Sequence, residues 1–483
     1  MNIAMILEMA ASNGDRRAVT ADGRSLSAVR LLDLARAAAG RFRDYPAVLY
    51  LGTSHLAYPV ALFGAALAGV PFVPLNYRLG GQQLDGLRTR HPGALVLGPG
   101  DLDQLCSPGG TTPPDPPGPA DSEASAPDGE SAAVLLYTSG TTAAPKAAVL
   151  RHRHLLAYVL NTVEFGSAAD GDAALVAVPP YHVAGLANLL TNLYAGRRVV
   201  YLATFGAQEW LETVRREQVT HAMLVPTMLA RIVAEVSGAD AGTPTLRSLA
   251  YGGARAPRPV VERALRIFPG TGFVNAYGLT ETASSVAVLS PEDHRAALTS
   301  DDPAVRDRLG SVGRALPGIE FQVRAEGGEP AGPGESGLVF VRGEQISGEY
   351  GERSTLDADG WFATRDRGRL DPDGYLFIEG RADDTIIRGG ENIAPAEIED
   401  VLLAHPGIAE AAVVGVPDPE WGQRLVAVLV GNGDPAEIRQ WVRDRLRSAK
   451  TPDTIVFRAE LPKTDTGKLL RRTLLAELET THA

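Results

Sequence analysis

The chain has 483 residues, of which 45% are hydrophobic and 22% are charged, and its formal net charge is −12. A chain of this length exceeds one compact core, and the composition argues against disorder over most of it. The acidic balance argues against nucleic acid as a general partner and against an anionic membrane surface.

The first twelve residues, MNIAMILEMAAS, include Glu8, have no basic start and are too short to span a bilayer. They predict the first helix of the protein and no integral membrane contact. The single cysteine, Cys106, has no second cysteine with which to form an internal disulfide. This cysteine usage predicts a cytoplasmic location.

Helical and apolar segments alternate along most of the chain. A helical stretch rich in Ala, Leu and Arg covers about 28–42. Short apolar runs follow at 47–51, 70–75, 132–136, 173–178, 198–202, 221–226 and 246–251. This alternation predicts βα units and a largely parallel sheet. Segment 107–131, rich in Pro, Gly, Ser and acidic residues, predicts an exposed connector.

The pattern changes in the last third of the chain. Runs bounded by glycine at 334–343 and 371–380 alternate with period two, which predicts antiparallel hairpins. A compact tail follows, with apolar runs at 411–416 and 425–430. We therefore predict an α/β fold, with a large N-terminal domain of βα-rich sheets over 1–380 and a small α+β domain over 381–483.

A polar loop, YTSGTTAAPK at 137–146, comes directly after the apolar run at 132–136. Its hydroxyls, its flexible glycine and its terminal ammonium can wrap a polyphosphate; they belong to Thr138, Ser139, Gly140, Thr141, Thr142 and Lys146. An isolated segment of this kind could equally be a Ser/Thr-rich turn. It is not a Walker loop, because no Gly-Lys-Ser/Thr ends it.

Further motifs follow this loop in a fixed order. They are YGLTET at 277–282, GSVGRALPG at 310–318, GWFATRD at 360–366, GYLFIEGRADDTIIRGGENIAPAEIE at 374–399 and LPKTDTGK at 461–468. Together with the loop they resemble the adenylate-forming superfamily of acyl-CoA synthetases, adenylation domains and luciferases. The resemblance spans nearly the whole chain. It implies ATP, AMP, Mg²⁺ and coenzyme A as ligands, and a small C-terminal domain that is mobile.

The resemblance assigns the phosphate chemistry to four residues. Thr138 and Glu281 match the positions that hold phosphate and Mg²⁺, which prefers oxygen ligands. Lys146 would offset charge on the leaving pyrophosphate. Lys468 resembles the lysine that neutralises the carboxylate and α-phosphate during adenylation.

The resemblance also assigns the nucleoside site and the moving parts. Asp366 would accept the ribose hydroxyls with Arg381 as its partner, and Tyr277 would stack on adenine. The remaining nucleotide-binding positions are Gly252, Gly253, Ala254, Asn275, Ala276, Gly278 and Thr280. Asp383 resembles the hinge between half-reactions, and the segment Gly389, Gly390 and Glu391 resembles the lining of the pantetheine tunnel.

The acyl pocket is expected near PPYHVAGLAN at 179–188. His182 occupies a position where acyl- and aryl-CoA synthetases often carry an aromatic residue or histidine; the alternative is a satisfied core histidine. Amino-acid-activating relatives place an aspartate in this region, and this segment has none. We therefore expect a small-molecule carboxylic acid without an α-amine. Small residues at 183–185 and 283–285 suggest a roomy pocket.

Three residues depart from the family pattern around the nucleotide. Ala143, Ala147 and Arg365 stand where the family usually has glycine. If the two loop positions need positive φ or close approach to phosphate, each methyl costs about 1 kcal/mol or blocks the ligand. Arg365 places a bulky cation beside the ribose site. These changes raise the hypothesis of weakened adenylation with transfer of a preformed acyl-AMP to CoA retained.

We nevertheless favour the full two-step ligase, because Lys468 and Glu281 serve mainly the ATP half-reaction and both are present. In it, acid and ATP give acyl-AMP and pyrophosphate, and CoA then displaces AMP. Loading of a carrier protein, supply of acyl-AMP by a separate adenylating enzyme, and a catalytically inactive nucleotide-binding relative are the alternatives. The sequence leaves a homodimer open.

Overall fold

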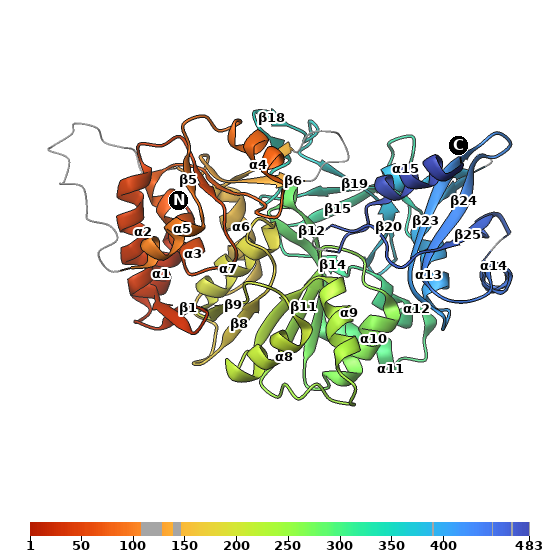
Figure 1. Cartoon of the computed structure of the whole chain (residues 1–483), viewed down its shortest axis with the longest axis horizontal. Coiled ribbons are helices and arrows are strands. Elements are labelled where there is room, and N and C mark those ends of the chain that lie inside the picture. The colour runs from red at the N-terminus through yellow and green to blue at the C-terminus, as the bar shows by residue number, and fades with distance from the viewer. Residues whose placement is uncertain (108–127, 139–145, 389–390, 447, 465–466, 483) are drawn as a thin grey trace.

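The computed structural model describes residues 1–107, 128–138, 146–388, 391–446, 448–464 and 467–482. Most of the expected connector at 107–131 and most of the loop at 137–146 therefore lie outside the described residues. The described chain forms a large body of sheets and helices with a smaller C-terminal part at one end (Figure 1). The predicted α/β class with a large N-terminal and a small C-terminal part is confirmed.

The largest sheet has nine strands in the order β14-β13-β12-β11-β10-β8-β9-β1-β2. Its central strands β8 to β12 run parallel, and β13 pairs antiparallel with β12. The strands are β1 (Arg17–Ala21), β2 (Arg24–Ser27), β8 (Ala173–Val176), β9 (Arg198–Tyr201), β10 (His221–Leu224), β11 (Ser248–Gly252), β12 (Gly272–Leu279), β13 (Ser284–Leu289) and β14 (Arg314–Ala315).

A second sheet has seven strands in the order β18-β17-β7-β6-β4-β3-β5. Its N-terminal half is parallel, whereas β6 and β7 form an antiparallel pair that β17 extends. The strands are β3 (Val48–Tyr50), β4 (Phe72–Pro74), β5 (Leu95–Leu97), β6 (Ala132–Thr138), β7 (Lys146–Arg151), β17 (Glu349–Tyr350) and β18 (Arg353–Ser354).

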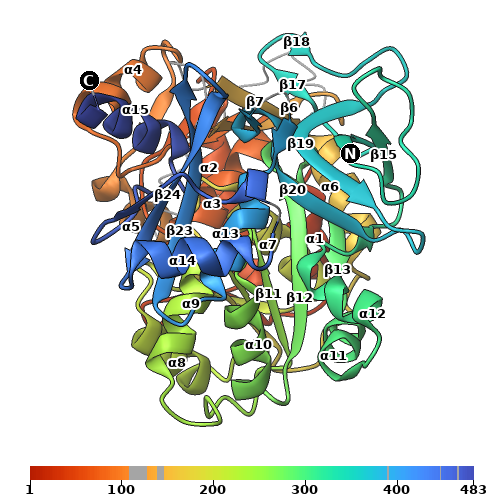
Figure 2. The same ribbon diagram turned by 90° about the vertical axis from the view of Figure 1, so that its right-hand side faces the viewer.

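The third sheet is antiparallel, as the period-two runs predicted, in the order β15-β16-β19-β20. Its strands are β15 (Glu320–Arg324), β16 (Gly337–Arg342), β19 (Phe362–Leu370) and β20 (Leu376–Arg381). This sheet lies between the nine-stranded sheet and the C-terminal part (Figures 1 and 2).

Helices cover the sheets of the large part. They are α1 (Ala4–Ser12), α2 (Ala28–Phe42), α3 (Ala57–Ala68), α4 (Gly81–Arg88), α5 (Pro99–Cys106), α6 (His152–Thr162), α7 (Val183–Ala195), α8 (Ala207–Arg216), α9 (Pro226–Glu235), α10 (Arg258–Ile267), α11 (Pro291–Thr299) and α12 (Pro303–Asp307). Two short 3₁₀ turns belong to the same part: η1 (Thr280–Thr282) lies between β12 and β13, and η2 (Arg308–Gly310) lies between α12 and β14. Among the described residues, no helix combines the length and apolar character that crossing a bilayer requires.

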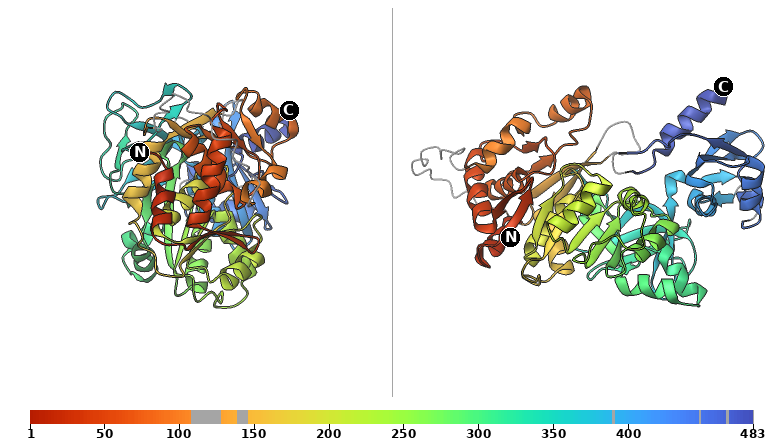
Figure 3. Two further views of the ribbon diagram at one scale, coloured as in Figure 1. Left: turned by 90° about the vertical axis from the view of Figure 1, so that its left-hand side faces the viewer. Right: turned by 60° about the horizontal axis from the view of Figure 1, so that its bottom comes forward.

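The C-terminal part follows η3 (Ala382–Asp384) and stands out from the large body (Figure 3, right). It contains β21 (Ile386–Arg388), β22 (Glu391–Ile393), α13 (Pro395–Leu403), β23 (Ile408–Asp418), β24 (Gly422–Gly431), α14 (Pro435–Arg443), η4 (Ser448–Lys450), β25 (Thr454–Phe457) and α15 (Arg471–His482). Buried side chains of β23, β24 and α13 form a core of its own. The domain boundary at 380/381 stays a prediction.

Candidate active site

The predicted phosphate loop connects β6 to β7. Thr138 and Lys146 close the strand pair, and the Thr138 hydroxyl donates to the Lys146 carbonyl at 3.4 Å. The predicted ligands between them, Ser139, Gly140, Thr141 and Thr142, lie outside the described residues, as does Ala143.

Ala147 is an ordinary strand residue. It pairs with Tyr137 in the antiparallel register of β6 and β7, and its φ does not lie in the left-handed region. The anticipated cost of a methyl at positive φ therefore does not apply at Ala147. Arg365 differs, because its φ is +62° and its side chain is exposed.

Glu281 is buried in η1, directly after β12. Its carbonyl accepts from the backbone N–H groups of Ser347 at 2.9 Å and Gly348 at 3.2 Å. Its carboxylate accepts a hydrogen bond from the Tyr350 hydroxyl. Burial and the neighbouring Glu281 raise the pKa of Tyr350, which keeps this hydroxyl a donor.

Tyr350 also lies beside Lys146, whose ammonium is 5.9 Å from the centroid of the tyrosine ring. Sequence reasoning missed this tyrosine. No local motif marks it, because it reaches Glu281 only through the pairing of β17 with β7, in which Tyr350 lies opposite Ala148.

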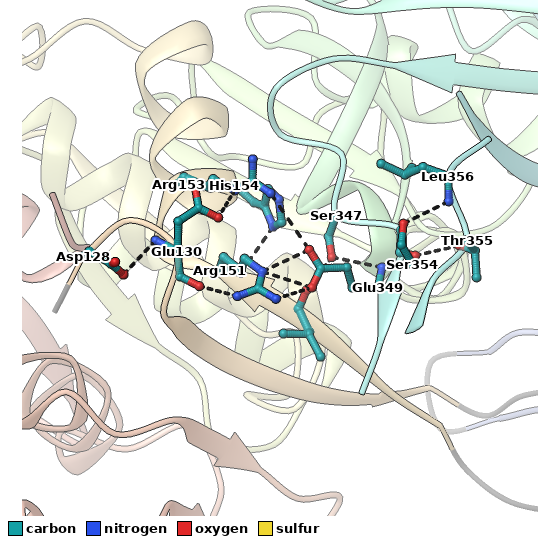
Figure 4. Close-up of polar contacts among 12 residues, drawn as sticks. Asp128, Glu130, Arg151, Arg153, His154, Ser347, Glu349, Ser354, Thr355 and Leu356 are labelled. Atoms are coloured by element: carbon teal, nitrogen blue, oxygen red, sulfur yellow. Dashed lines mark hydrogen bonds and ion pairs between the residues drawn. The ribbon is translucent and has the colours of Figure 1, made fainter. Parts of the chain in front are cut away.

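A network of ion pairs fixes β17 beside β7 (Figure 4). The Arg151 guanidinium binds the Glu349 carboxylate, with the closest N–O distance 2.7 Å and both side chains largely buried. Arg153 lies 4.0 Å from the same carboxylate and 3.2 Å from Glu130. Since Glu349 precedes Tyr350, this network holds the tyrosine on Glu281.

Asp366 is buried at the start of the β19–β20 pairing, opposite Arg381. One carboxylate oxygen accepts from the Tyr277 hydroxyl at 2.6 Å, and the other lies 3.1 Å from the Arg381 Nε. Burial raises the pKa of Asp366, whereas Arg381 and Tyr277 oppose the rise. The three predicted nucleoside residues therefore form one contiguous group.

Close backbone contacts explain two predicted glycines beside this group. A Cβ on Gly252 at the end of β11 would collide with the Ala276 carbonyl of β12, and one on Gly278 would collide with the backbone of Ser284. The other predicted nucleotide positions lie on the same strands or directly after them: Gly253 and Ala254 follow β11, Asn275 belongs to β12 and donates to the Ser311 carbonyl at 3.0 Å, and Thr280 begins η1.

Lys468 reaches this site from the C-terminal part. The preceding Gly467 packs so closely on Thr227 of α9 that an added Cβ would collide with the threonine side chain. Desolvation and then Arg381 lower the pKa of the Lys468 ammonium, whereas Asp366 and Glu281 are among the charges that raise it. The residue nevertheless keeps an exposed surface. Its charge thus acts on both carboxylate groups of the large part.

The predicted hinge and tunnel residues lie on the link between the two parts. Asp383 is exposed in η3, and Glu391 begins β22, whereas Gly389 and Gly390 lie outside the described residues. An exposed ion pair between Arg255, after β11, and Asp400 of α13 also crosses from one part to the other.

His182 precedes α7, and its ring centroid lies 4.6 Å from that of Tyr181. Helix α7 packs against β13, which carries the small residues Ser284 and Ser285. Tyr158 of α6 lies close to these two serines. Polar groups therefore accompany the small residues predicted for the acyl pocket.

The donor set suits a magnesium ion that shares its ligands with phosphate. Glu281 and Thr138 offer oxygen atoms, which Mg²⁺ prefers. Within the described residues, no group of three or more His, Cys, Asp or Glu side chains could hold a metal ion by itself. A cation here would need the substrate's phosphate oxygens to complete its coordination.

Family comparison matches the chain in both of its parts. The model described as AMP-binding enzyme matches residues 7–350, and the model described as AMP-binding enzyme C-terminal domain matches residues 397–468. A feruloyl-CoA synthase from an Amycolatopsis species is 37% identical over 92% of this chain and 90% of its own. A 2-succinylbenzoate–CoA ligase from Bacillus licheniformis is 37% identical over 71% of this chain and 70% of its own.

Solved structures of related enzymes share the overall fold of this chain. The o-succinylbenzoate CoA synthetase of Bacillus subtilis with its acyl-adenylate intermediate gives a TM-score of 0.83 at 26% identity, covering 98% of both chains. The same enzyme with ATP and magnesium ion gives a TM-score of 0.81 at 27% identity, covering 98% of this chain and 99% of its own.

Proposed function

The chain belongs to the AMP-binding enzyme family, and from this premise we propose how its residues divide the work of an AMP-forming acid–thiol ligase. The protein is an acyl-CoA synthetase that joins a carboxylic acid to coenzyme A through an acyl-AMP intermediate. One observation supports this division of roles: Gly467, directly before Lys468, packs against Thr227 of the large part, which brings Lys468 close enough to feel the charges of Asp366 and Glu281.

In the first half-reaction the acid's carboxylate attacks the α-phosphorus of ATP, and pyrophosphate leaves. Asp366, held by Tyr277 and Arg381, would orient the ribose. Lys468 would bring the two anionic reactants together, and Lys146 would offset charge on the leaving group. Mg²⁺, bound by Glu281, Thr138 and phosphate oxygens, would neutralise further charge.

In the second half-reaction the CoA thiol attacks the acyl carbonyl, and AMP leaves. Since Lys468 would serve the first half-reaction from the present arrangement, the C-terminal part would have to turn about Asp383 before the segment at 389–391 could face the acyl-AMP. The ordinary strand conformation of Ala147 and the intact Asp366 group support the full ligase over transfer of a preformed acyl-AMP alone.

We propose an aromatic carboxylic acid as the substrate class. The relatives named for feruloyl-, 2-succinylbenzoate and indoleacetate substrates are 32–37% identical to this chain. Tyr158, Ser284 and Ser285 supply polar groups for a ring substituent, and the small Ala184 and Gly185 begin the neighbouring helix. His182 would lie beside the acyl group.

The test is a panel of aromatic, aliphatic and amino acids supplied with ATP, Mg²⁺ and CoA. We expect acyl-CoA, AMP and pyrophosphate in equal amounts from an aromatic acid, measured by mass spectrometry and a pyrophosphate assay. Turnover of synthetic acyl-AMP with CoA but no acid-dependent pyrophosphate would contradict the first half-reaction. An aliphatic preference would contradict the substrate class alone.

A carrier protein is the second candidate acceptor, because a fatty acid–[acyl-carrier-protein] ligase from Streptomyces coeruleorubidus is 31% identical over 88% of this chain. Comparing free CoA with a pantetheinylated carrier under the same conditions separates the two acceptors. A homodimer and a cytoplasmic location stay predictions.

A further inference from the structure

Arg471 is the first residue of α15 and comes shortly after Lys468 in the chain. The loop that carries Lys468 is closed by its own hydrogen bonds. The Thr464 N–H donates to the Lys468 carbonyl at 2.8 Å, and the Lys468 N–H donates to the Thr464 hydroxyl at 3.0 Å. The Leu470 N–H donates to the Pro462 carbonyl at 2.9 Å. Because the loop is closed, the position of Lys468 depends on where Arg471 is held.

The Arg471 guanidinium is held by three segments of the C-terminal part. Its Nη1 lies 2.6 Å from one carboxylate oxygen of Glu399 in α13, and its Nη2 donates to the other oxygen at 2.8 Å. Nη1 also donates to the Val413 carbonyl of β23 at 2.8 Å. Nε lies 3.4 Å from the carboxylate of Asp384 in η3. All three charged side chains are mostly buried, so one arginine ties α15 to α13, β23 and η3.

The contact with Asp384 lies directly beside the proposed hinge, Asp383. On the other side of the hinge, Arg381 donates to the Thr364 carbonyl at 2.7 Å and lies 3.1 Å from Asp366, both in β19 of the large part. The Asp383 side chain between these anchors is exposed and, within the part of the chain that the structure describes, makes no hydrogen bond or ion pair. Two ion pairs therefore bracket the turn, one to each part of the protein.

This bracketing limits where the chain can turn. A hinge works when a few residues absorb the change in backbone angles while the segments on both sides stay rigid. Only Ala382 and Asp383 lie between the two anchored residues. After Asp384 the chain enters the buried core of the C-terminal part at Ile386. Without the ion pair of Asp384, the turn would extend toward Ile386, and the position of Lys468 against the large part would be less well defined.

We propose that Arg471 is a positioning residue that fastens the hinge turn to the loop carrying Lys468, so that the C-terminal part turns as one rigid body at residues 382–383. The assignment rests on the proposed function. An arginine that served only the packing of α15 would need only its contacts with Glu399 and Val413. The contact with Asp384 is the one that reaches the hinge, so a change at Asp384 separates the two roles.

Three variants make this separation. Asp384→Asn removes the ion pair at the hinge and leaves the other contacts of Arg471, whereas Asp384→Glu keeps a carboxylate within reach and is the conservative rescue. Arg458→Met is the matched control, because it breaks an ion pair that holds α15 through Glu477 instead of Arg471. With the whole chain, single-turnover assays measure acyl-AMP formation and transfer from synthetic acyl-AMP to CoA. The KM values for acid, ATP and CoA and the melting temperature are measured alongside.

We expect Asp384→Asn to slow both half-reactions about tenfold, because each depends on accurate placement of the C-terminal part. Its KM values should stay within twofold of the wild type, and its melting temperature within about 2 °C. Asp384→Glu should recover most of both rates, and Arg458→Met should keep both.

Unchanged rates in Asp384→Asn, a loss confined to one half-reaction, no recovery in Asp384→Glu, or equal losses in Asp384→Asn and Arg458→Met would overturn the proposal and leave the proposed function standing. A wild type that releases no pyrophosphate in response to any acid would overturn the proposed function, and this assignment with it.

Discussion

The active site has two halves that are built differently. In the large part, Glu281 and Asp366 are buried, and each is held by a tyrosine. In the C-terminal part, Lys468 is an exposed residue on a loop whose packing against α9 depends on Gly467. Strands preorganise the half of the site in the large part, called here the fixed half. The half in the C-terminal part, which we propose moves between the two steps and call the movable half, is held by a loop contact and an exposed ion pair.

This difference matches what each half must do. A two-step reaction needs its nucleotide site in both steps. Asp366 can therefore stay buried and fixed throughout, because it does not have to move between them. In the proposed mechanism Lys468 acts in the first step only. The link across the two parts at Arg255 and Asp400 is an exposed ion pair, which contributes at most about 1 kcal/mol. Breaking this ion pair would therefore add little to the energetic cost of separating the two parts.

Removing Lys468 should give the largest effect and should affect one step only. We expect Lys468→Ala to slow acyl-AMP formation by about 10²- to 10³-fold, since a charge aimed at the transition state is lost. Transfer from synthetic acyl-AMP to CoA should stay within a few-fold. Single-turnover assays of each step measure this.

Lys463→Ala, which removes a nearby lysine paired with Glu410 at 2.6 Å, is the control and should leave both steps intact. Equal losses in both steps for Lys468→Ala would contradict the division.

Glu281 should matter almost as much. We expect Glu281→Gln to lower acyl-AMP formation by about 10²-fold and to raise the Mg²⁺ concentration for half-maximal rate, because an amide oxygen binds the cation less well. Tyr350→Phe keeps the carboxylate and removes only its hydrogen bond, so its loss should be about tenfold. A Mg²⁺ requirement unchanged in Glu281→Gln would remove this residue from the metal site.

The ion pair between Arg151 and Glu349, which supports the half of the site in the large part, should contribute to the free energy of unfolding. We expect Arg151→Met to lower the free energy of unfolding by about 2 kcal/mol, because Glu349 would be left largely buried without its partner. Arg342→Met breaks the more exposed pair with Glu320 and should cost less than about 1 kcal/mol. Urea unfolding compares the two. Equal costs would mean that the network in Figure 4 does not anchor β17.

Lys468 should also set the alkaline limb of the pH–rate profile of the first step. Desolvation and Arg381 lower the pKa of Lys468, so its ammonium is lost at a lower pH than that of an ordinary lysine. Because the charged form is the active one, the first step should slow as pH rises through this pKa, and the second should not. Lys468→Arg should keep any residual first-step rate flat over the same range. A limb shared by both steps would exclude Lys468 as its source.

The sequence predicts those features of the molecule whose physical cause lies in neighbouring residues, and misses those that depend on distant strand pairing. Helix α2 has the predicted bounds because the Ser27 hydroxyl accepts from the Arg30 N–H at 3.2 Å and sets its start. The motifs predicted Glu281, Asp366 and Lys468, which the structure brings to one site. Tyr350 could not be predicted, since its place depends on strand pairing across some two hundred residues.

Arg365 lies between these cases. Its departure from glycine is visible in the sequence, which predicts a bulky cation beside the ribose site. The left-handed backbone of Arg365 could not be predicted, because it depends on the bulge opposite Val339 and on the anchoring of Thr364. Asp366 keeps both of its partners beside this arginine.

The most direct measurement joins the two halves covalently. In a Cys106→Ser background, Arg255→Cys and Asp400→Cys would be bridged by a short bis-methanethiosulfonate linker, which dithiothreitol removes. With acid, ATP and CoA, we predict one equivalent of pyrophosphate per bridged site, no acyl-CoA, and recovery of turnover on reduction. Continuous acyl-CoA formation by the bridged enzyme would contradict the claim that Lys468 must leave the site between the two steps.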